Sequence, residues 1–249
     1  MSNRVNTANR RAMLAANQAY AATLPAAQRQ LPLAPSKKYL IVTCMDARID
    51  PAKAFGINLG DAHVIRNAGG SAKAALRDII ISTHFLGVEE VFIIKHKDCG
   101  MKLLNSTGKP VIQQLYPDHI VCPGASSIVD MPFHEFACPY AAVRADWWFV
   151  QNHPAIRAND ASKPERKIII HGFVYDPATG TLDDVEPQVD PSQNPIPGSQ
   201  PNPPPAEAAS GPACDNNNTT ISSATDYDTA PSSFKDTSNK AAAGIATTT

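Results

Sequence analysis

Short apolar runs rich in β-branched residues alternate along the chain with longer stretches of helical periodicity. Five such runs predict strands, the first four with the character of buried strands: residues 39–43, 62–66, 91–95, 167–174 and a short fifth at 181–185. Apolar residues recur at helical spacing in residues 71–85 and 140–152, with Ser71 as a plausible N-cap of the first. Strands alternating with helices predict an α/β fold: a mostly parallel β-sheet flanked by helices.

The two ends of the chain differ from this middle part. Residues 1–35 contain four arginines and no acidic residue, and their alanine-rich stretch 8–22 favours helix. We expect an N-terminal helical arm here; a mitochondrial transit segment is the alternative. Residues 187–249 carry ten of the 22 prolines and no apolar run able to form a core face, so a disordered Pro/Ser/Thr-rich tail is predicted. The folded domain is therefore expected over residues 36–186.

Charge and hydropathy exclude several classes of partner. The net charge is -1 and charged residues make up 18% of the chain, so no polyelectrolyte argument favours nucleic acid or a membrane surface. No apolar run reaches the length of a spanning helix. Without a secretory signal, the sequence predicts a cytoplasmic protein, with mitochondria as the alternative. Its five cysteines are then expected to be thiols or metal ligands rather than a disulfide framework.

Three potential metal ligands follow two of the predicted strands. Cys44 comes directly after the first strand, and His96 and Cys99 follow the third. The carboxyl ends of neighbouring parallel strands face one crevice, and two thiolates with one imidazole suit tetrahedral zinc. Three protein ligands would leave a fourth position for water, as in catalytic zinc sites. The alternative is a buried thiol and a core histidine without a metal.

An acidic and a basic residue lie close to the first cysteine. Asp46 is the remaining candidate ligand, and Arg48 is two residues further on, able to bind its carboxylate bidentately. Asp46 would either orient the reacting water or occupy the fourth metal position in a resting form.

These motifs together resemble a known family. CMDARIDP, GDAHVIRNAGG and HKDCGM, in this order and spacing, are similar to the β-class carbonic anhydrases, in the short fungal and bacterial branch that also includes carbonyl sulfide hydrolases. The resemblance covers about Asn17 to Val185. It implies that Cys44, His96 and Cys99 bind one Zn²⁺ per chain, that Asp46 and Arg48 form the catalytic dyad, and that the N-terminal arm contacts a second subunit.

The resemblance implies a zinc lyase, with CO2 or bicarbonate as its small-molecule substrate. The expected reaction is the reversible hydration of CO2 to bicarbonate and a proton, by attack of a zinc-bound hydroxide. A carbonyl sulfide or carbon disulfide hydrolase that uses the same zinc site and releases hydrogen sulfide is the alternative. A non-enzymatic zinc protein whose tail binds a partner is a third hypothesis. The assembly expected is a homodimer or a dimer of dimers, with no nucleic acid and no membrane involved.

The chain departs from the family pattern beside the ligand histidine. Relatives commonly have His and Thr where this chain has Lys95 and Lys97. Both lysines are predicted to border the cleft entrance, where they would affect substrate preference more than the chemistry.

Overall fold

The computed structural model describes residues 6–104, 108–115, 132–156 and 168–185. The predicted tail 187–249 lies outside these residues, as do the third and fifth cysteines of the chain, Cys122 and Cys214.

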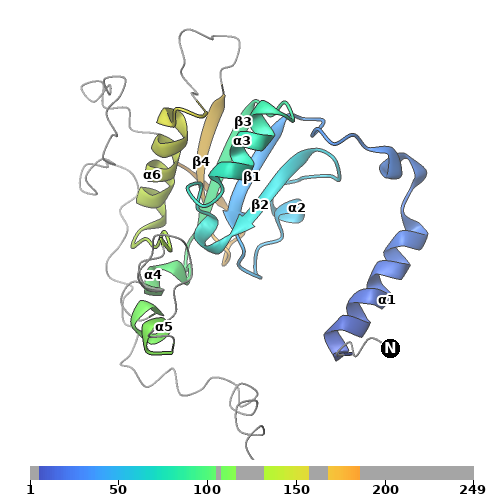
Figure 1. Cartoon of the computed structure of the whole chain (residues 1–249), viewed down its shortest axis with the longest axis horizontal. Coiled ribbons are helices and arrows are strands. Elements are labelled where there is room, and N and C mark those ends of the chain that lie inside the picture. Colours follow the sequence, from blue (N-terminus) through green and yellow to red (C-terminus); the bar gives the residue numbers. More distant parts are fainter. Residues whose placement is uncertain (1–5, 105–107, 116–131, 157–167, 186–249) are drawn as a thin grey trace, which may run out of the picture. The chain divides into compact units, whose positions relative to one another are not determined.

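Five strands form one sheet, as the hydrophobic runs predict (Figure 1). The strands are β1 (Tyr39–Cys44), β2 (Ala62–Asn67), β3 (Glu90–His96), β4 (Ile169–Tyr175) and β5 (Leu182–Asp184). Their order across the sheet is β2-β1-β3-β4-β5. The first three pairings are parallel and only β5 runs antiparallel to β4. The α/β class with a mostly parallel sheet is confirmed.

Helices lie over the three stretches predicted as helical, 8–22, 71–85 and 140–152, apart from one boundary, and three shorter helices were not predicted. The α-helices are α1 (Ala8–Thr23), α2 (Pro51–Ala54), α3 (Leu76–His84), α4 (Met101–Leu103), α5 (Lys109–Leu115) and α6 (Pro139–Asn152), with 3₁₀ turns η1 (Ala26–Gln30) and η2 (Ala68–Gly70). Ser71 is not the N-cap of α3, because its hydroxyl accepts from Ala74 N in a separate turn before the helix. Within the described residues, no helix is long and apolar enough to cross a membrane.

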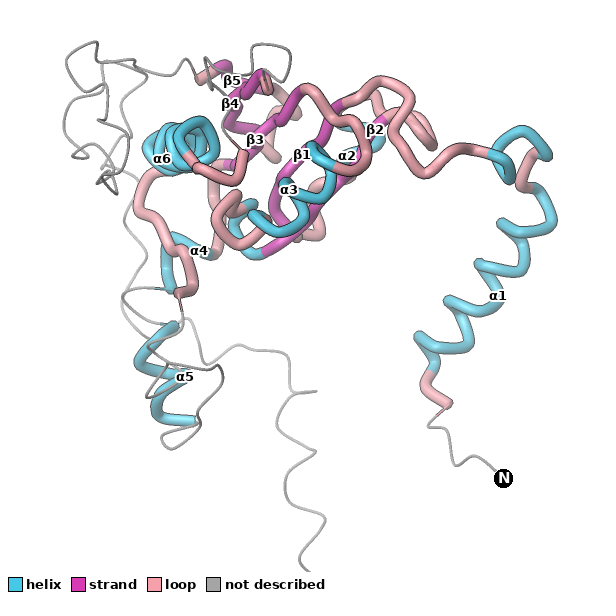
Figure 2. The backbone as a smooth tube through the Cα atoms, turned by 45° about the horizontal axis from the view of Figure 1, so that its top comes forward, coloured by secondary structure: helices cyan, strands magenta, loops and turns pink. Residues whose placement is uncertain are grey.

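The two faces of the sheet are packed by different elements. On one face, Leu40, Val42 and Val91 pack with residues of α3 and α6, and Figure 2 shows these two helices beside the central strands. On the other face, Ile41 and Ile94 pack with residues that flank α2, such as Ile49. Burying each large aliphatic side chain contributes about 1.5–3 kcal/mol, so both faces stabilise the central strands β1 and β3.

Burial on both faces fixes the position of the strand ends. β1 ends at Cys44 and β3 at His96. The two strands are hydrogen-bonded neighbours, with Thr43 opposite Ile94 in the register. The loops that leave their carboxyl ends therefore begin side by side, and these loops carry the candidate ligands.

Candidate metal centre

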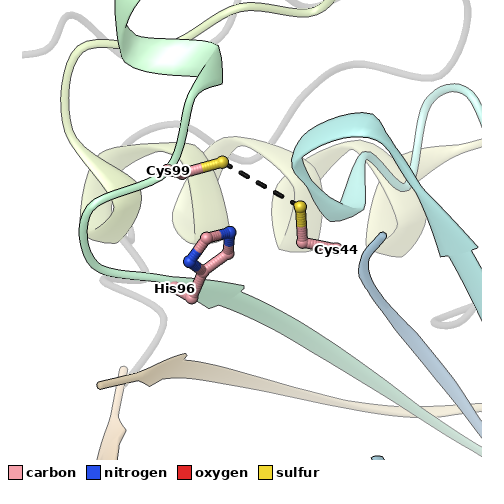
Figure 3. A group of neighbouring side chains, drawn as sticks. All are labelled: Cys44, His96 and Cys99. Atoms are coloured by element: carbon pink, nitrogen blue, oxygen red, sulfur yellow. Dashed lines mark hydrogen bonds between the residues drawn. The ribbon is translucent and has the colours of Figure 1, made fainter. Parts of the chain in front are cut away.

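Three buried side chains converge where β1 and β3 end (Figure 3). Cys44 is the last residue of β1 and His96 the last of β3, while Cys99 lies in the following turn before α4. Cys44 and Cys99 are 5% exposed and His96 is fully buried. Their ligand atoms all lie within 4.8 Å of one another. The structure thus brings together all three residues that the sequence singles out as ligands.

The hydrogen bonds of His96 leave one ring nitrogen for a metal. Nδ1 lies 2.8 Å from the carbonyl oxygen of Lys97, and because a carbonyl can only accept, Nδ1 must carry the proton. The opposite nitrogen, Nε2, is buried and has no hydrogen-bond partner among the described residues. A buried polar atom without a partner is costly. A metal ion at Nε2 would satisfy it, and the Nδ1 bond to a carbonyl is the usual outer contact of a metal-binding histidine.

The spacing of the two sulfurs also fits zinc. Sγ of Cys44 and Sγ of Cys99 are 4.0 Å apart. Two thiolates bound tetrahedrally at Zn–S distances of about 2.3 Å would lie about 3.8 Å apart. The donor set of two sulfurs and one imidazole nitrogen is therefore both chemically and geometrically suited to zinc.

The two cysteines titrate differently because they share a proton. The pKa of Cys44 is lowered to about 4, chiefly by the hydrogen bond from Cys99 and further by interaction with the His96 side chain and with the backbone N–H groups of Asp46 and Gly69. The pKa of Cys99 is raised, because it retains the shared proton and is buried. The opposite directions of the two shifts follow from one proton held between the two sulfurs, which a zinc ion bound to both would displace.

Asp46 lies at the mouth of this cluster and is bound by Arg48. Arg48 donates to Asp46 Oδ1 from its backbone N at 2.9 Å and from Nε at 3.0 Å, and to Oδ2 from Nη2 at 2.8 Å. These bonds lower the pKa of Asp46 to about 2. Oδ2 of Asp46 lies 3.8 Å from His96 Nε2, so the carboxylate faces the side on which a metal would bind.

Two residues outside the predicted ligand set and catalytic pair fix this loop, and one of them, Asp98, was weighed from the sequence as either a loop-fixing acceptor or a catalytic group. Asp98 accepts from Arg48 Nη1 at 2.8 Å through its carboxylate and from Nη2 at 2.9 Å through its carbonyl, so it orients the guanidinium. Arg66, on β2, donates to the carbonyls of Cys44 at 3.1 Å and Asp46 at 2.7 Å. The only signal for Arg66 in the sequence is its place at the end of a strand that neighbours β1.

The prediction for the lysines beside His96 is wrong for one of them. Lys97 is 40% exposed and pairs with Asp176 and Asp183 at 3.3 and 3.1 Å. Lys95 is only 2% exposed and forms an ion pair inside the protein, so it does not border an entrance. Side chains alternate along a strand, and Lys95 projects toward the face covered by α6.

The expectation for the cysteines is also corrected at one position. Cys44 and Cys99 are free thiols, as a metal site requires. Cys138, which immediately precedes α6, is disulfide-bonded. The spacing of cysteines in the sequence does not reveal which of them approach one another.

Comparison with known proteins identifies the family. The profile of the carbonic anhydrase family matches residues 39–182, more than half of the chain. Beta-carbonic anhydrase 1 of Mycobacterium tuberculosis is 33% identical over 158 residues, which cover 63% of this chain and 87% of that protein. The solved carbonic anhydrase from Glaciozyma antarctica is 35% identical with a TM-score of 0.61, covering 73% of this chain and all of that one.

The chain therefore belongs to the carbonic anhydrase family, in its β class. Its Cys44, His96 and Cys99 cluster is typical of the zinc site of that class. The relatives also include a carbon disulfide hydrolase from Acidithiobacillus thiooxidans, 28% identical over 172 residues that cover 63% of this chain and 81% of that protein.

Proposed function

We propose that the protein catalyses the reversible hydration of CO2, with one zinc ion bound by Cys44, His96 and Cys99 and with Asp46 and Arg48 as the catalytic pair. The observation that carries this proposal is the unpartnered, buried Nε2 of His96, which lies beside two sulfurs and 3.8 Å from a carboxylate oxygen of Asp46. When bound, zinc lowers the pKa of water toward about 7 and so supplies a nucleophile at neutral pH.

Asp46 is suited to orient that nucleophile. Its low pKa keeps the carboxylate ionised and able to accept a hydrogen bond at neutral pH. Accepting a hydrogen bond from the reacting water directs the remaining lone pair of that water toward the carbon of CO2. The Asp46 side chain is 18% exposed, so this side of the site is in contact with solvent.

Arg48 acts by keeping Asp46 available for this role. Its three bonds to Asp46 occupy both carboxylate oxygens, and Asp98 holds the far side of the guanidinium. Without Arg48, the carboxylate would be free to move onto the metal and block the fourth ligand position. Planar bidentate binding of a carboxylate is the particular property of arginine, so lysine would not replace it.

Hydrolysis of carbonyl sulfide or carbon disulfide is the second candidate. The similarity to a carbon disulfide hydrolase supports it, and both alternative substrates are linear triatomics with an electrophilic carbon. We rank CO2 first, because the ligand set and the Asp46–Arg48 pair match the anhydrase pattern unaltered and the anhydrase relatives are more similar.

One assay distinguishes the two candidates. Purified, zinc-loaded protein is given CO2 and carbonyl sulfide side by side, with proton release and hydrogen sulfide as the two readouts. We expect fast CO2 hydration and little hydrogen sulfide. Efficient hydrogen sulfide release with feeble CO2 hydration would reverse the ranking. No activity on either substrate by a protein that binds zinc would favour a non-enzymatic zinc protein.

Domain organisation and assembly are part of the same proposal. We propose an arm over residues 1–35 that contacts a second subunit in a homodimer or dimer of dimers, a catalytic domain over 36–186, and a dispensable tail over 187–249. Exposed apolar side chains on α1 support the arm: Met13 is 73%, Leu14 47% and Tyr20 53% exposed. Truncation after Glu186 should leave CO2 hydration unchanged, and an inactive product would refute that boundary. A cytoplasmic location stays a prediction from the sequence.

A further inference from the structure

A buried ion pair includes the residue that precedes a proposed zinc ligand in the chain. Nζ of Lys95, the residue before His96, is 2.8 Å from Asp146 Oδ2 on α6. The two side chains are 2% and 8% exposed. Removing two charges from water costs several kcal/mol each, and well-packed apolar residues often serve stability equally well. The contribution of this pair to the free energy of unfolding therefore does not explain why two charged residues are buried here.

The remaining donors of Lys95 bind the loop that follows β2. Nζ lies 3.2 Å from the carbonyl oxygens of both Gly69 and Gly70, so its three N–H groups all have acceptors. The ring of Phe136 lies 5.2 Å from Nζ on a further side. The ammonium group is thus fixed by two backbone carbonyls, one carboxylate and one aromatic ring.

The same two glycines face the cysteine ligand. Both have positive φ, 72° at Gly69 and 59° at Gly70. A Cβ on Gly70 would lie 2.9 Å from the carbonyl carbon of Thr43 and 3.0 Å from the nitrogen of Cys44, so this backbone passes against the end of β1. A hydrogen bond from the backbone N–H of Gly69 is also one of the causes that lower the pKa of the Cys44 thiol. Lys95 therefore binds the carbonyl oxygen of Gly69, and the N–H of the same residue hydrogen-bonds to the Cys44 thiolate.

We propose that Lys95, held by Asp146, is a positioning residue of the zinc site: it fixes the Gly69–Gly70 backbone so that the Gly69 amide donates to the Cys44 thiolate. This inference rests on the proposed zinc site. According to this inference, Lys95 lowers the electron density at the Cys44 sulfur through the Gly69 amide. An ion pair that only stabilised the fold would not have this effect. An N–H donor withdraws electron density from a thiolate.

The test replaces the pair without leaving a lone buried charge. In the variant Lys95→Met with Asp146→Asn, methionine keeps the apolar stem, and asparagine keeps an acceptor for the N–H of Ala72, which Asp146 binds at 2.9 Å. Two readouts are taken on full-length protein: hydrogen exchange of the amides at 69–70, and the sulfur-to-metal charge-transfer band of the Co²⁺-substituted protein. The control is Lys37→Met, which removes a lysine–aspartate pair of the same 2.8 Å length whose lysine is 54% exposed.

The proposal predicts a local change. Exchange at 69–70 should become roughly tenfold faster or more, while exchange in β1 at residues 40–42 stays as in the unaltered protein. The charge-transfer band should move to longer wavelength, because the Cys44 sulfur becomes more electron-rich. Lys37→Met should change neither readout. If the double variant does not fold, Asp146→Asn alone should give smaller changes in the same direction.

Two results would overturn the proposal. An unchanged band with unchanged exchange at 69–70 would mean that the pair does not act on the site. Equal acceleration at 69–70 and at 40–42 would assign it to general stability. If the unaltered protein binds Co²⁺ without any sulfur charge-transfer band, the zinc site itself is wrong and this inference falls with it, so the two failures are distinguishable.

Discussion

The loops at the carboxyl ends of β1 and β3, which carry the ligands and are called the zinc edge below, differ from helix α1 in what holds them in place. The edge consists mainly of loops and turns, yet Cys44, His96 and Cys99 are almost completely buried, and charged hydrogen bonds fix the loops around them. α1 is a regular helix of 16 residues, with Thr7 accepting from Arg10 N as its N-cap, and none of its residues is buried. A helix of this length is marginal in water without packing. Regular secondary structure is thus no measure of how firmly a segment is held.

The comparison also separates two sources of rigidity. The zinc edge depends on pairs far apart in sequence, such as Arg48 with Asp98 and Lys95 with Asp146. The hydrogen bonds of α1 are local, and its larger apolar side chains are exposed. Changes at the edge should therefore abolish function within one chain, whereas changes in α1 should affect assembly.

The largest effect is expected at the metal ligands. The double variant His96→Ala with Cys99→Ser removes two of three donors, so zinc should be lost and activity should fall to the uncatalysed background. Metal content per chain by elemental analysis measures this. His171→Ala, which removes a histidine 36% exposed on β4, is the matched control and should retain one zinc. Retention of zinc by the double variant would contradict the ligand assignment.

The catalytic pair should come next. Asp46→Asn leaves the ligand set intact but weakens the acceptor that orients water, so zinc should remain while kcat falls roughly 10²–10⁴-fold. Arg48→Ala should act similarly by freeing Asp46. Stopped-flow CO2 hydration on zinc-loaded protein gives kcat and KM separately. Asp50→Asn, at the N-cap of α2, is the control with the same chemical change and should remain active, and a fully active Asp46→Asn enzyme would refute the role of Asp46.

A glycine substitution tests how tightly the edge is packed. Gly70→Ala combines positive φ with close contacts to the backbone of Thr43 and Cys44, so we expect a loss of about 3 kcal/mol or more in the free energy of unfolding. Gly87→Ala also has positive φ, but nothing lies within 4 Å of its Cβ. It should cost only about 1–2 kcal/mol. Urea unfolding at equilibrium measures both, and equal losses would mean that the close approach at Gly70 is relaxed without cost.

The smallest effect on the fold is expected at α1. Deleting residues 1–30 removes α1 and the 3₁₀ turn η1, neither of which contains a buried residue, so the unfolding midpoint of the remaining chain should change little at a fixed protein concentration. The proposed contact with a second subunit should be weakened, which sedimentation velocity would detect as a shift toward monomer. An unchanged assembly would contradict the proposal that the exposed apolar side chains of α1 contact a second subunit. A large drop in the unfolding midpoint would show that the arm contributes to the stability of the folded domain.

The sequence alone determined the elements and the candidate ligands. β-branched runs and helical periodicity predicted all five strands and the helices α3 and α6, because these patterns reflect burial along a single element. Helix α1, which has no buried residue, was predicted from its alanine-rich composition instead. The ligands could be predicted because Cys44, His96 and Cys99 directly follow strands, and strand ends of a parallel sheet meet at one edge. Where α3 begins was not predicted, since Ser71 binds within its own turn instead of capping the helix.

Only the tertiary structure decided which polar groups meet at that edge. Lys95 and Asp146 are 51 residues apart, and Arg48 and Asp98 are 50 apart, so no local pattern connects them. Nor does the sequence around Lys95 indicate that this lysine is buried, since a lysine is rarely buried unless a charged partner reaches it. That partner comes from α6, and its position depends on how the helix packs on the sheet. Hydrophobic periodicity shows which face of α6 packs on the sheet, but it does not show which polar residue of the helix meets a given strand residue. Only the contacts of the folded chain decide the partner of a buried charge.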